Sequence, residues 1–272
     1  MKIKAGPALR SYDGRPSWQR ASQLVRAATA KGVSKDRLVE QLAREFLASV
    51  RNLGEGLGMW NREDLIQGKV RDTASGLIKL SQDIQPGERE IFLEILMMAA
   101  RIHHTPTFQH QERVAALSLR VAAELGLASE EEDSLSIASL LHDIGKVIVP
   151  VRLLDAKRRL NHNETFLVKN MHLLFGYYLL DSIPFLKNAA RIVGFNHVFD
   201  GYQPEGFSEN AIPLAGQILS AADFYDALTD LKRAYKPPFP PQEALRYVSA
   251  RPYDPTLLAA LKKILAAGTA GT

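Results

Sequence analysis

Residues 135–146 read Leu135-Ser-Ile-Ala-Ser-Leu-Leu-His-Asp-Ile-Gly-Lys146, an apolar run closed by an imidazole, a carboxylate and an amine. The apolar part predicts a buried helix. If that helix ends at His142 and Asp143, both side chains can reach one metal ion. Lys146, one turn later, would then lie where it can meet a phosphate bound to that ion. A His-Asp pair often arises by chance, so this interpretation depends on further ligands elsewhere in the chain.

The composition restricts how a metal ion could be held. The chain has 272 residues, 46% hydrophobic and 24% charged, which is enough for one large domain or two modest ones with a buried core. Cysteine is absent, which excludes disulfides, zinc-thiolate sites and thiol catalysis. A metal ion must therefore be held by histidine and carboxylate, and such ligands suit Mn, Fe, Zn, Ni or Mg.

Charge and hydropathy give little sign of a large partner. The formal net charge of +4 is spread along expected helical faces, with no aromatic residues between the basic ones, so we expect no DNA or RNA partner. No run approaches the ~18 apolar residues of a spanning helix, so we expect no membrane partner. Residues 1–7 have no apolar core behind their lysines, unlike a secretory signal. We therefore expect a cytoplasmic protein.

Apolar residues recur at helical spacing almost throughout the chain, and strand signals are nearly missing. The one β-like run, Val147 to Val149, is too short to imply a sheet. An all-α fold is therefore predicted, with Ser34 as the cap of one helix. Helices are expected at residues 17–30, 35–50, 62–81, 88–102, 111–125, 129–141, 163–182, 187–197, 213–230, 241–250 and 255–267.

An interruption near 102–108, at His103-His-Thr-Pro-Thr107, predicts a domain boundary. It would separate an N-terminal helical region, 1–102, from a C-terminal helical domain, 103–272. The N-terminal region carries no readable motif. It could be a sensor or dimerisation domain, or an extension that packs on the bundle, and both alternatives stay open.

The metal-ligand candidates fall on or at the ends of separate predicted helices. Any single histidine on an apolar face is more often a hydrogen-bonded core residue. Asp223, however, lies in a helix so apolar that burying its carboxylate would be costly without a cation. Asp226 is interpreted as structural and bonded to neighbouring backbone, and His103, His104 and His162 are expected in solvent. Six residues form the candidate set, as in bundle sites that project ligands inward: His110, His142, Asp143, His172, His197 and Asp223.

In this order the candidates resemble the HD superfamily of metal-dependent phosphohydrolases, which implies an HD-type helical bundle, and within it the HD-GYP subfamily of cyclic-di-GMP phosphodiesterases. The resemblance runs from about His110 to Pro255, a little over half the chain. It rests on His110-Gln-Glu-Arg-Val114, Leu140-Leu-His-Asp-Ile-Gly-Lys-Val-Ile-Val-Pro150, Leu160-Asn-His-Asn-Glu164 with His172-Leu-Leu-Phe-Gly176, and Ala222-Asp-Phe-Tyr-Asp-Ala-Leu-Thr229 with Arg233-Ala-Tyr-Lys236.

The chain departs from the subfamily at its eponymous segment, which usually reads His-His-Glu-x-x-Asp-Gly-x-Gly-Tyr-Pro. Here the segment reads Asn196-His-Val-Phe-Asp-Gly-Tyr-Gln-Pro-Glu-Gly206. An asparagine replaces the first histidine, and the glutamate after the pair is lost. Members that hold three metals also carry a glutamate one turn before the first histidine, where this chain has Pro106. A third metal is therefore not expected.

The resemblance also implies a reaction. Two divalent ions are expected, Fe or Mn first, with Mg, Ni or Zn as alternatives. Lys146 would neutralise charge on the phosphoryl group, and Asp143 would bridge the ions, which makes both residues catalytic. Tyr202, Arg233 and Lys236 would contact the substrate. The ligands of the first ion would be His110, His142, Asp143 and Asp223, and those of the second Asp143, His172 and His197.

Three functions stay open at this point. The first is a phosphodiesterase acting on cyclic di-GMP or a related cyclic dinucleotide. The second is a phosphohydrolase with another nucleotide or phosphoester as substrate. The third is a catalytically weak regulator, with residues 1–102 as the surface for a homodimer or a signalling protein. The retained ligand set and Lys146 favour an active phosphohydrolase, and the altered segment 196–206 leaves its substrate open.

Overall fold

The computed structural model describes residues 34–51, 68, 70–83, 89–196, 198, 207, 212–231 and 237–269, and every regular element within them is a helix. The all-α prediction is confirmed. No helix in these ranges is both long and apolar enough to cross a bilayer. The elements are α2 (Lys35–Val50), α5 (Ser75–Asp83), α6 (Arg89–His103), α7 (Thr105–Leu125), α8 (Ser129–Leu141), η5 (Ile144–Ile148), α9 (Val151–Leu154), α10 (His162–Phe166), η6 (Leu167–Met171), α11 (His172–Asp181), η7 (Pro184–Leu186), α12 (Lys187–Asn196), α13 (Leu214–Thr229), α14 (Pro241–Ser249) and α15 (Pro255–Thr269).

Local sequence explains where the helices begin and end. The predicted cap of α2 is confirmed, because the Ser34 side chain accepts a hydrogen bond from the Arg37 amide. α7 begins six residues before its predicted start. His104 caps it by accepting from the Thr107 amide, and Pro106 lies in its first turn, where a missing N–H costs nothing. Gly126 ends α7 in the left-handed region, with φ of 68°.

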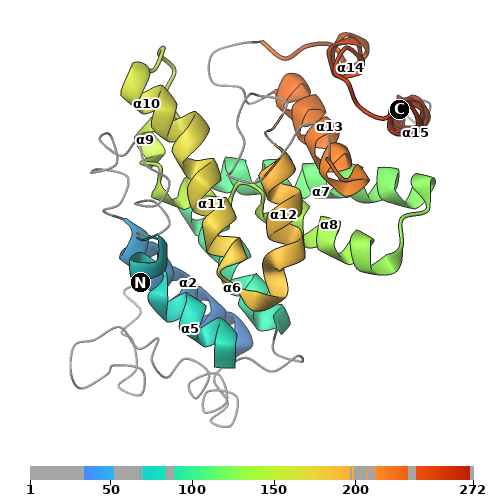
Figure 1. Cartoon of the computed structure of the whole chain (residues 1–272). Coiled ribbons are helices and arrows are strands. Elements are labelled where there is room, and N and C mark those ends of the chain that lie inside the picture. The colour runs from blue at the N-terminus through green and yellow to red at the C-terminus, as the bar shows by residue number, and fades with distance from the viewer. Residues whose placement is uncertain are drawn as a thin grey trace, which may run out of the picture.

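The helices share one hydrophobic core. α7 packs against α6, α8, α13 and α15, and Figure 1 shows α11 and α12 side by side in front of it. Phe46 of α2, Phe92 of α6 and Phe175 of α11 are among the largest fully buried side chains of this core. α6 contacts α2 and α7, so helices from both sides of residue 102 contribute to it. The division into 1–102 and 103–272 stays a prediction.

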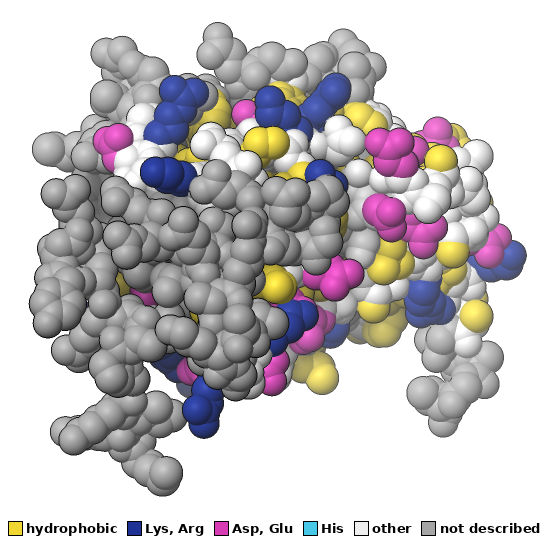
Figure 2. Space-filling model, turned by 90° about the horizontal axis from the view of Figure 1, so that it is seen from below, with side chains coloured by type: hydrophobic (Ala, Val, Ile, Leu, Met, Phe, Trp, Pro, Cys, Tyr) yellow, Lys and Arg dark blue, Asp and Glu magenta, His cyan; other side chains and the backbone are white. Residues whose placement is uncertain are grey.

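Charged side chains of both signs cover the described part of the face in Figure 2, and no histidine is visible among them. This view agrees with the burial of His142 and His172, which are 1% and 4% exposed. The ligand candidates that the structure describes therefore belong to the interior of the bundle.

Two segments near the candidate site depart from regular α-helix. The predicted helix 163–182 contains a π-helical turn, η6, directly before His172. Such turns are rare in proteins and often occur at functional sites. The β-like run Val147 to Val149 instead belongs to the short helix η5 and its end. The Val149 amide there donates to the Lys146 carbonyl, 2.9 Å away, so this backbone closes a turn rather than pairing with a strand.

Gly145 sets how closely η5 approaches α11. A Cβ atom at residue 145 would overlap the backbone carbonyl oxygen of His172 and come within 2.8 Å of the Gly176 amide nitrogen. Neither obstacle is a flexible side chain, so the clash cannot be relieved without moving backbone. The glycine of the His-Asp-Ile-Gly-Lys segment is therefore what lets Asp143 and His172 approach each other.

We predict that Gly145→Ala lowers the free energy of unfolding by about 1–3 kcal/mol, since overpacking a filled core costs that much. Gly68→Ala is the matched control, because a Cβ at residue 68 would meet nothing within 4 Å. Chemical denaturation of both variants checks the prediction. Equal stability of the two variants would contradict it.

Candidate metal centre

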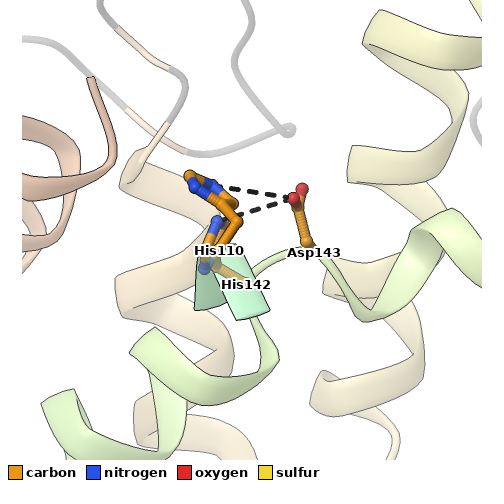
Figure 3. Close-up of side chains that lie close together, drawn as sticks. All are labelled: His110, His142 and Asp143. Atoms are coloured by element: carbon orange, nitrogen blue, oxygen red, sulfur yellow. Dashed lines mark ion pairs between the residues drawn. The ribbon is translucent and has the colours of Figure 1, made fainter. Parts of the chain in front are cut away.

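Three side chains converge at the C-terminal end of α8 (Figure 3). His110 comes from α7, His142 is the C-cap of α8, and Asp143 follows it. The Nε2 atoms of His110 and His142 lie 4.0 and 3.7 Å from Asp143 Oδ2. One ligand atom from each residue lies within 4.8 Å of the other two, a spacing that suits a shared metal ion.

Asp223 of α13 brings a second carboxylate to the same place. Its Oδ1 lies 3.0 Å from His110 Nε2 and 3.7 Å from His142 Nε2. Its Oδ2 accepts a hydrogen bond of 2.9 Å from the side-chain amide of Asn196, the buried last residue of α12. The two oxygens are therefore distinguished: Asn196 holds Oδ2, while Oδ1 faces the imidazoles.

Asp143 faces two groups of side chains at once. Its Oδ1 lies 3.5 Å from His172 Nε2 on α11, and its Oδ2 lies on the side of His110 and His142. Lys146, one turn along, forms an ion pair with Oδ2. Asp143 is only 3% exposed. This carboxylate is thus the one group that touches every other part of the cluster.

Both imidazoles of the first group are held from behind. His142 Nδ1 donates to the Ser139 carbonyl at 2.9 Å, and its buried Nε2 has no hydrogen-bond partner. His110 Nδ1 lies 2.7 Å from Asp226 Oδ2. A metal-binding histidine commonly uses its other ring nitrogen in this way, which fixes the tautomer and directs Nε2 toward the metal.

The titration of these groups reflects a site that demands positive charge. Burial lowers the pKa of His142, which favours the neutral ring with a free lone pair. Burial raises the pKa of Asp143, but Lys146, His142 and His172 hold it well below its usual range. Burial also lowers the pKa of His110, but hydrogen bonds to Asp223 and Asp226 raise it to about 10. The carboxylates that favour a proton on His110 would equally favour a metal cation.

Asp226 has a role that the sequence interpretation missed. Its partners are side chains and not the neighbouring backbone: besides His110, it accepts two hydrogen bonds from Arg113, at 2.8 and 2.7 Å. Arg113 also reaches Asp230, at 3.1 Å. The signal was present in the spacing, because residues three apart share one face of a helix. His110 and Arg113 on α7 thus face Asp223 and Asp226 on α13.

The structure brings five of the six ligand candidates together, and Lys146 lies beside them. The sixth, His197, and the substrate-contact candidates Tyr202, Arg233 and Lys236 lie outside the described residues. The cluster therefore draws on α7, the end of α8, α11 and α13. Its described members are His110, His142, Asp143, His172 and Asp223.

Two of the histidines that were expected in solvent are not there. His103 Nε2 lies 2.9 Å from the Val149 carbonyl, and His104 caps α7 and contacts Asp155. The prediction failed because α6 and α7 meet at these residues and the following helices fold back over them. His162 is exposed, as predicted.

These features define an all-α protein with a buried histidine–carboxylate metal centre and an adjacent lysine. The HD domain family, by its profile, matches residues 94–257, more than half of the chain. The chain therefore belongs to the HD domain family. Together, the family and the cluster imply a site for a divalent metal ion.

Curated relatives extend this comparison. A cyclic di-GMP phosphodiesterase from Thermotoga maritima is 35% identical over 179 residues, covering 63% of this chain and 48% of that protein. The cyclic di-GMP phosphodiesterase response regulator RpfG of Xanthomonas campestris is 30% identical over 245 residues, covering 87% and 63%. A 3'3'-cGAMP-specific phosphodiesterase from Vibrio cholerae is 31% identical over 188 residues, covering 66% and 35%. The chain thus spans between a third and two thirds of the length of these relatives.

We predict that Asp226→Asn weakens the binding of Mn²⁺ by about tenfold or more, because removing an outer partner of a ligating histidine typically costs 10–100-fold in affinity. Asp230→Asn is the matched control, since Asp230 also pairs with Arg113. Calorimetric titration of the metal-free protein measures both affinities. An affinity in Asp226→Asn equal to that of the control would show that Asp226 does not support the site.

Proposed function

We propose that the chain is a metal-dependent phosphodiesterase that hydrolyses a cyclic dinucleotide, with cyclic di-GMP as its first candidate substrate. The observation that carries the proposal is the buried meeting of His110 and His142 with Asp143 and Asp223, with Lys146 beside it. The names of the relatives support the substrate class, since each of the three refers to a cyclic-dinucleotide phosphodiesterase.

We propose two divalent ions, with Fe or Mn first. The opposed oxygens of Asp143 support this number, because Oδ2 faces His110 and His142 while Oδ1 faces His172. When bound, the ions would supply an activated water at neutral pH and Lewis-acid polarisation of the phosphoryl oxygens. The first ion would be held by His110, His142, Asp143 and Asp223, and the second by Asp143, His172 and His197.

The chain's own residues would then bind and orient the phosphodiester. Lys146 offers a compact cation that can neutralise a phosphoryl oxygen, and its ion pair with Asp143 holds it at the site before substrate arrives. Asn196 keeps Asp223 Oδ1 turned toward the imidazoles. Tyr202, Arg233 and Lys236 are proposed to contact the phosphate or base groups of the substrate. A role of residues 1–102 in dimerisation or in binding a signalling protein stays a prediction.

A second candidate substrate is 3'3'-cGAMP. Three of the relatives, all from Vibrio cholerae, are named as specific for it, at 31 to 34% identity. That range includes the identity of RpfG to within a percentage point, so overall similarity does not choose between the two dinucleotides. Another phosphoester substrate, or a regulator without activity, remains as an outcome of the test.

The test uses the full chain, stripped of metal and reloaded with Mn²⁺ or, without oxygen, with Fe²⁺. Cyclic di-GMP, 3'3'-cGAMP and bis(p-nitrophenyl) phosphate are supplied in parallel. We expect a cyclic dinucleotide to be hydrolysed, and the ratio of kcat/KM values identifies which one. Hydrolysis of the generic diester alone would point to another phosphoester, and inactivity with both metals would rule out the enzyme.

Metal content gives a prediction that does not depend on turnover. We predict two bound ions in the reloaded wild type, one in His172→Ala and fewer than one in Asp143→Ala, because only Asp143 faces both groups of ligands. Elemental analysis measures the count, and His162→Ala, which changes an exposed histidine, should keep two. A wild-type count of one would reject the second ion, and full content in Asp143→Ala would reject the centre.

A further inference from the structure

His103 lies at the junction of α6 and α7, outside the cluster of ligand candidates. It is the last residue of α6, and its partly buried ring contacts the segment that follows the His-Asp pair. Its Nε2 lies 2.9 Å from the carbonyl oxygen of Val149. Because a carbonyl oxygen only accepts, Nε2 must carry the hydrogen and donate it. The contact therefore has a defined direction, from α6 to the backbone at the end of η5.

That carbonyl belongs to a short chain of backbone hydrogen bonds that leads to Asp143. The Val149 amide donates to the Lys146 carbonyl, and the Lys146 amide donates to the Asp143 carbonyl, each at 2.9 Å. Val149 is the C-cap of η5, and Asp143 is its N-cap. The bond from His103 thus reaches the end of a single helical turn whose other end is the buried carboxylate of the site.

Lys146 depends on this turn for its position. Its side chain is 23% exposed and forms an ion pair with Asp143, so a small rotation of η5 would carry the amine away from the carboxylate. On one side, η5 is gripped by α11, where Gly145 lies against the His172 backbone. On the other side it contacts α6, to which His103 belongs. The turn is therefore held between two helices, and His103 supplies the hydrogen bond on the α6 side.

The ring suits a permanent structural donor. Burial lowers the pKa of His103 below its ordinary value, so the ring is neutral at neutral pH and carries one N–H. The neighbouring His104 holds the next element, with its Nε2 3.1 Å from Asp155 Oδ1 at the end of α9. Two adjacent histidines thus fasten successive parts of the segment 144–155 to the α6–α7 junction.

We infer that His103 is a positioning residue for the proposed reaction: its hydrogen bond to the Val149 carbonyl holds η5 so that Lys146 stays beside Asp143. This inference rests on the proposed function. It assigns to α6, which also packs against α2, direct control over the position of a catalytic cation.

The test compares two replacements of similar length in the full chain. His103→Gln keeps an N–H donor near the position of Nε2, whereas His103→Met fills similar space without one. His162→Gln, at an exposed histidine, is the control. For His103→Met we expect kcat to fall by about tenfold with KM within about twofold, since small misplacement of a catalytic group lowers rate more than binding. His103→Gln should recover most of kcat.

Hydrogen exchange supplies a readout that does not require activity. The amides of Lys146 and Val149 should exchange about tenfold faster in His103→Met than in His103→Gln, because the turn opens more often when its end is released. Metal content should stay at the wild-type value in both variants. If His103→Met does not fold, His103→Asn, whose amide is too short to reach, takes its place.

Equal kcat and equal exchange in the two variants would overturn the inference. A drop in both variants that follows only their melting temperatures would do the same, since it would mark a purely structural residue. If the wild type hydrolyses no phosphodiester, the proposed function fails by itself. Exchange at Lys146 and Val149 then still decides whether His103 holds the turn.

Discussion

The structure depends on a carboxylate that is buried and yet charged. Asp143 is 3% exposed, and the free-energy penalty for taking an ion out of water is several kcal/mol unless opposite charge and hydrogen bonds compensate it. Lys146 and the imidazoles of His142 and His172 provide that compensation and lower the pKa of Asp143. A divalent ion would do so more strongly. The placement of α7, α8, α11 and α13 around this residue follows from the need to surround one negative charge with ligands.

Helix ends and helix faces supply the geometry. Because α8 ends at Leu141, His142 and Asp143 leave the helix together, and the glycine two residues later lets η5 press on α11. On the other side, i,i+3 spacing pairs His110 and Arg113 with Asp223 and Asp226 across two helices. The histidine that binds and the carboxylate that orients it therefore come from simple periodicity. Asn196, at the end of α12, completes the arrangement by holding one oxygen of Asp223.

Much of this could be predicted from the sequence, and the failures share a cause. Periodicity predicted most helices to within a few residues, and costly burial marked Asp223 before any contact was known. Asp226 and His103 were misjudged because their partners, His110 and Val149, lie 116 and 46 residues away in the chain. The π-helical turn before His172 was missed as well, because one extra residue in a helix leaves no mark on so apolar a pattern. Tertiary contacts decided all three.

The central claim is that the cluster exists to hold a divalent cation. Crystals of the full chain grown with Mn²⁺ would test it most directly through an anomalous difference map. The account predicts a peak between the Nε2 atoms of His110 and His142 and the carboxylates of Asp143 and Asp223. A well-ordered cluster without such a peak, with His110 still bonded directly to Asp223 at saturating Mn²⁺, would contradict it.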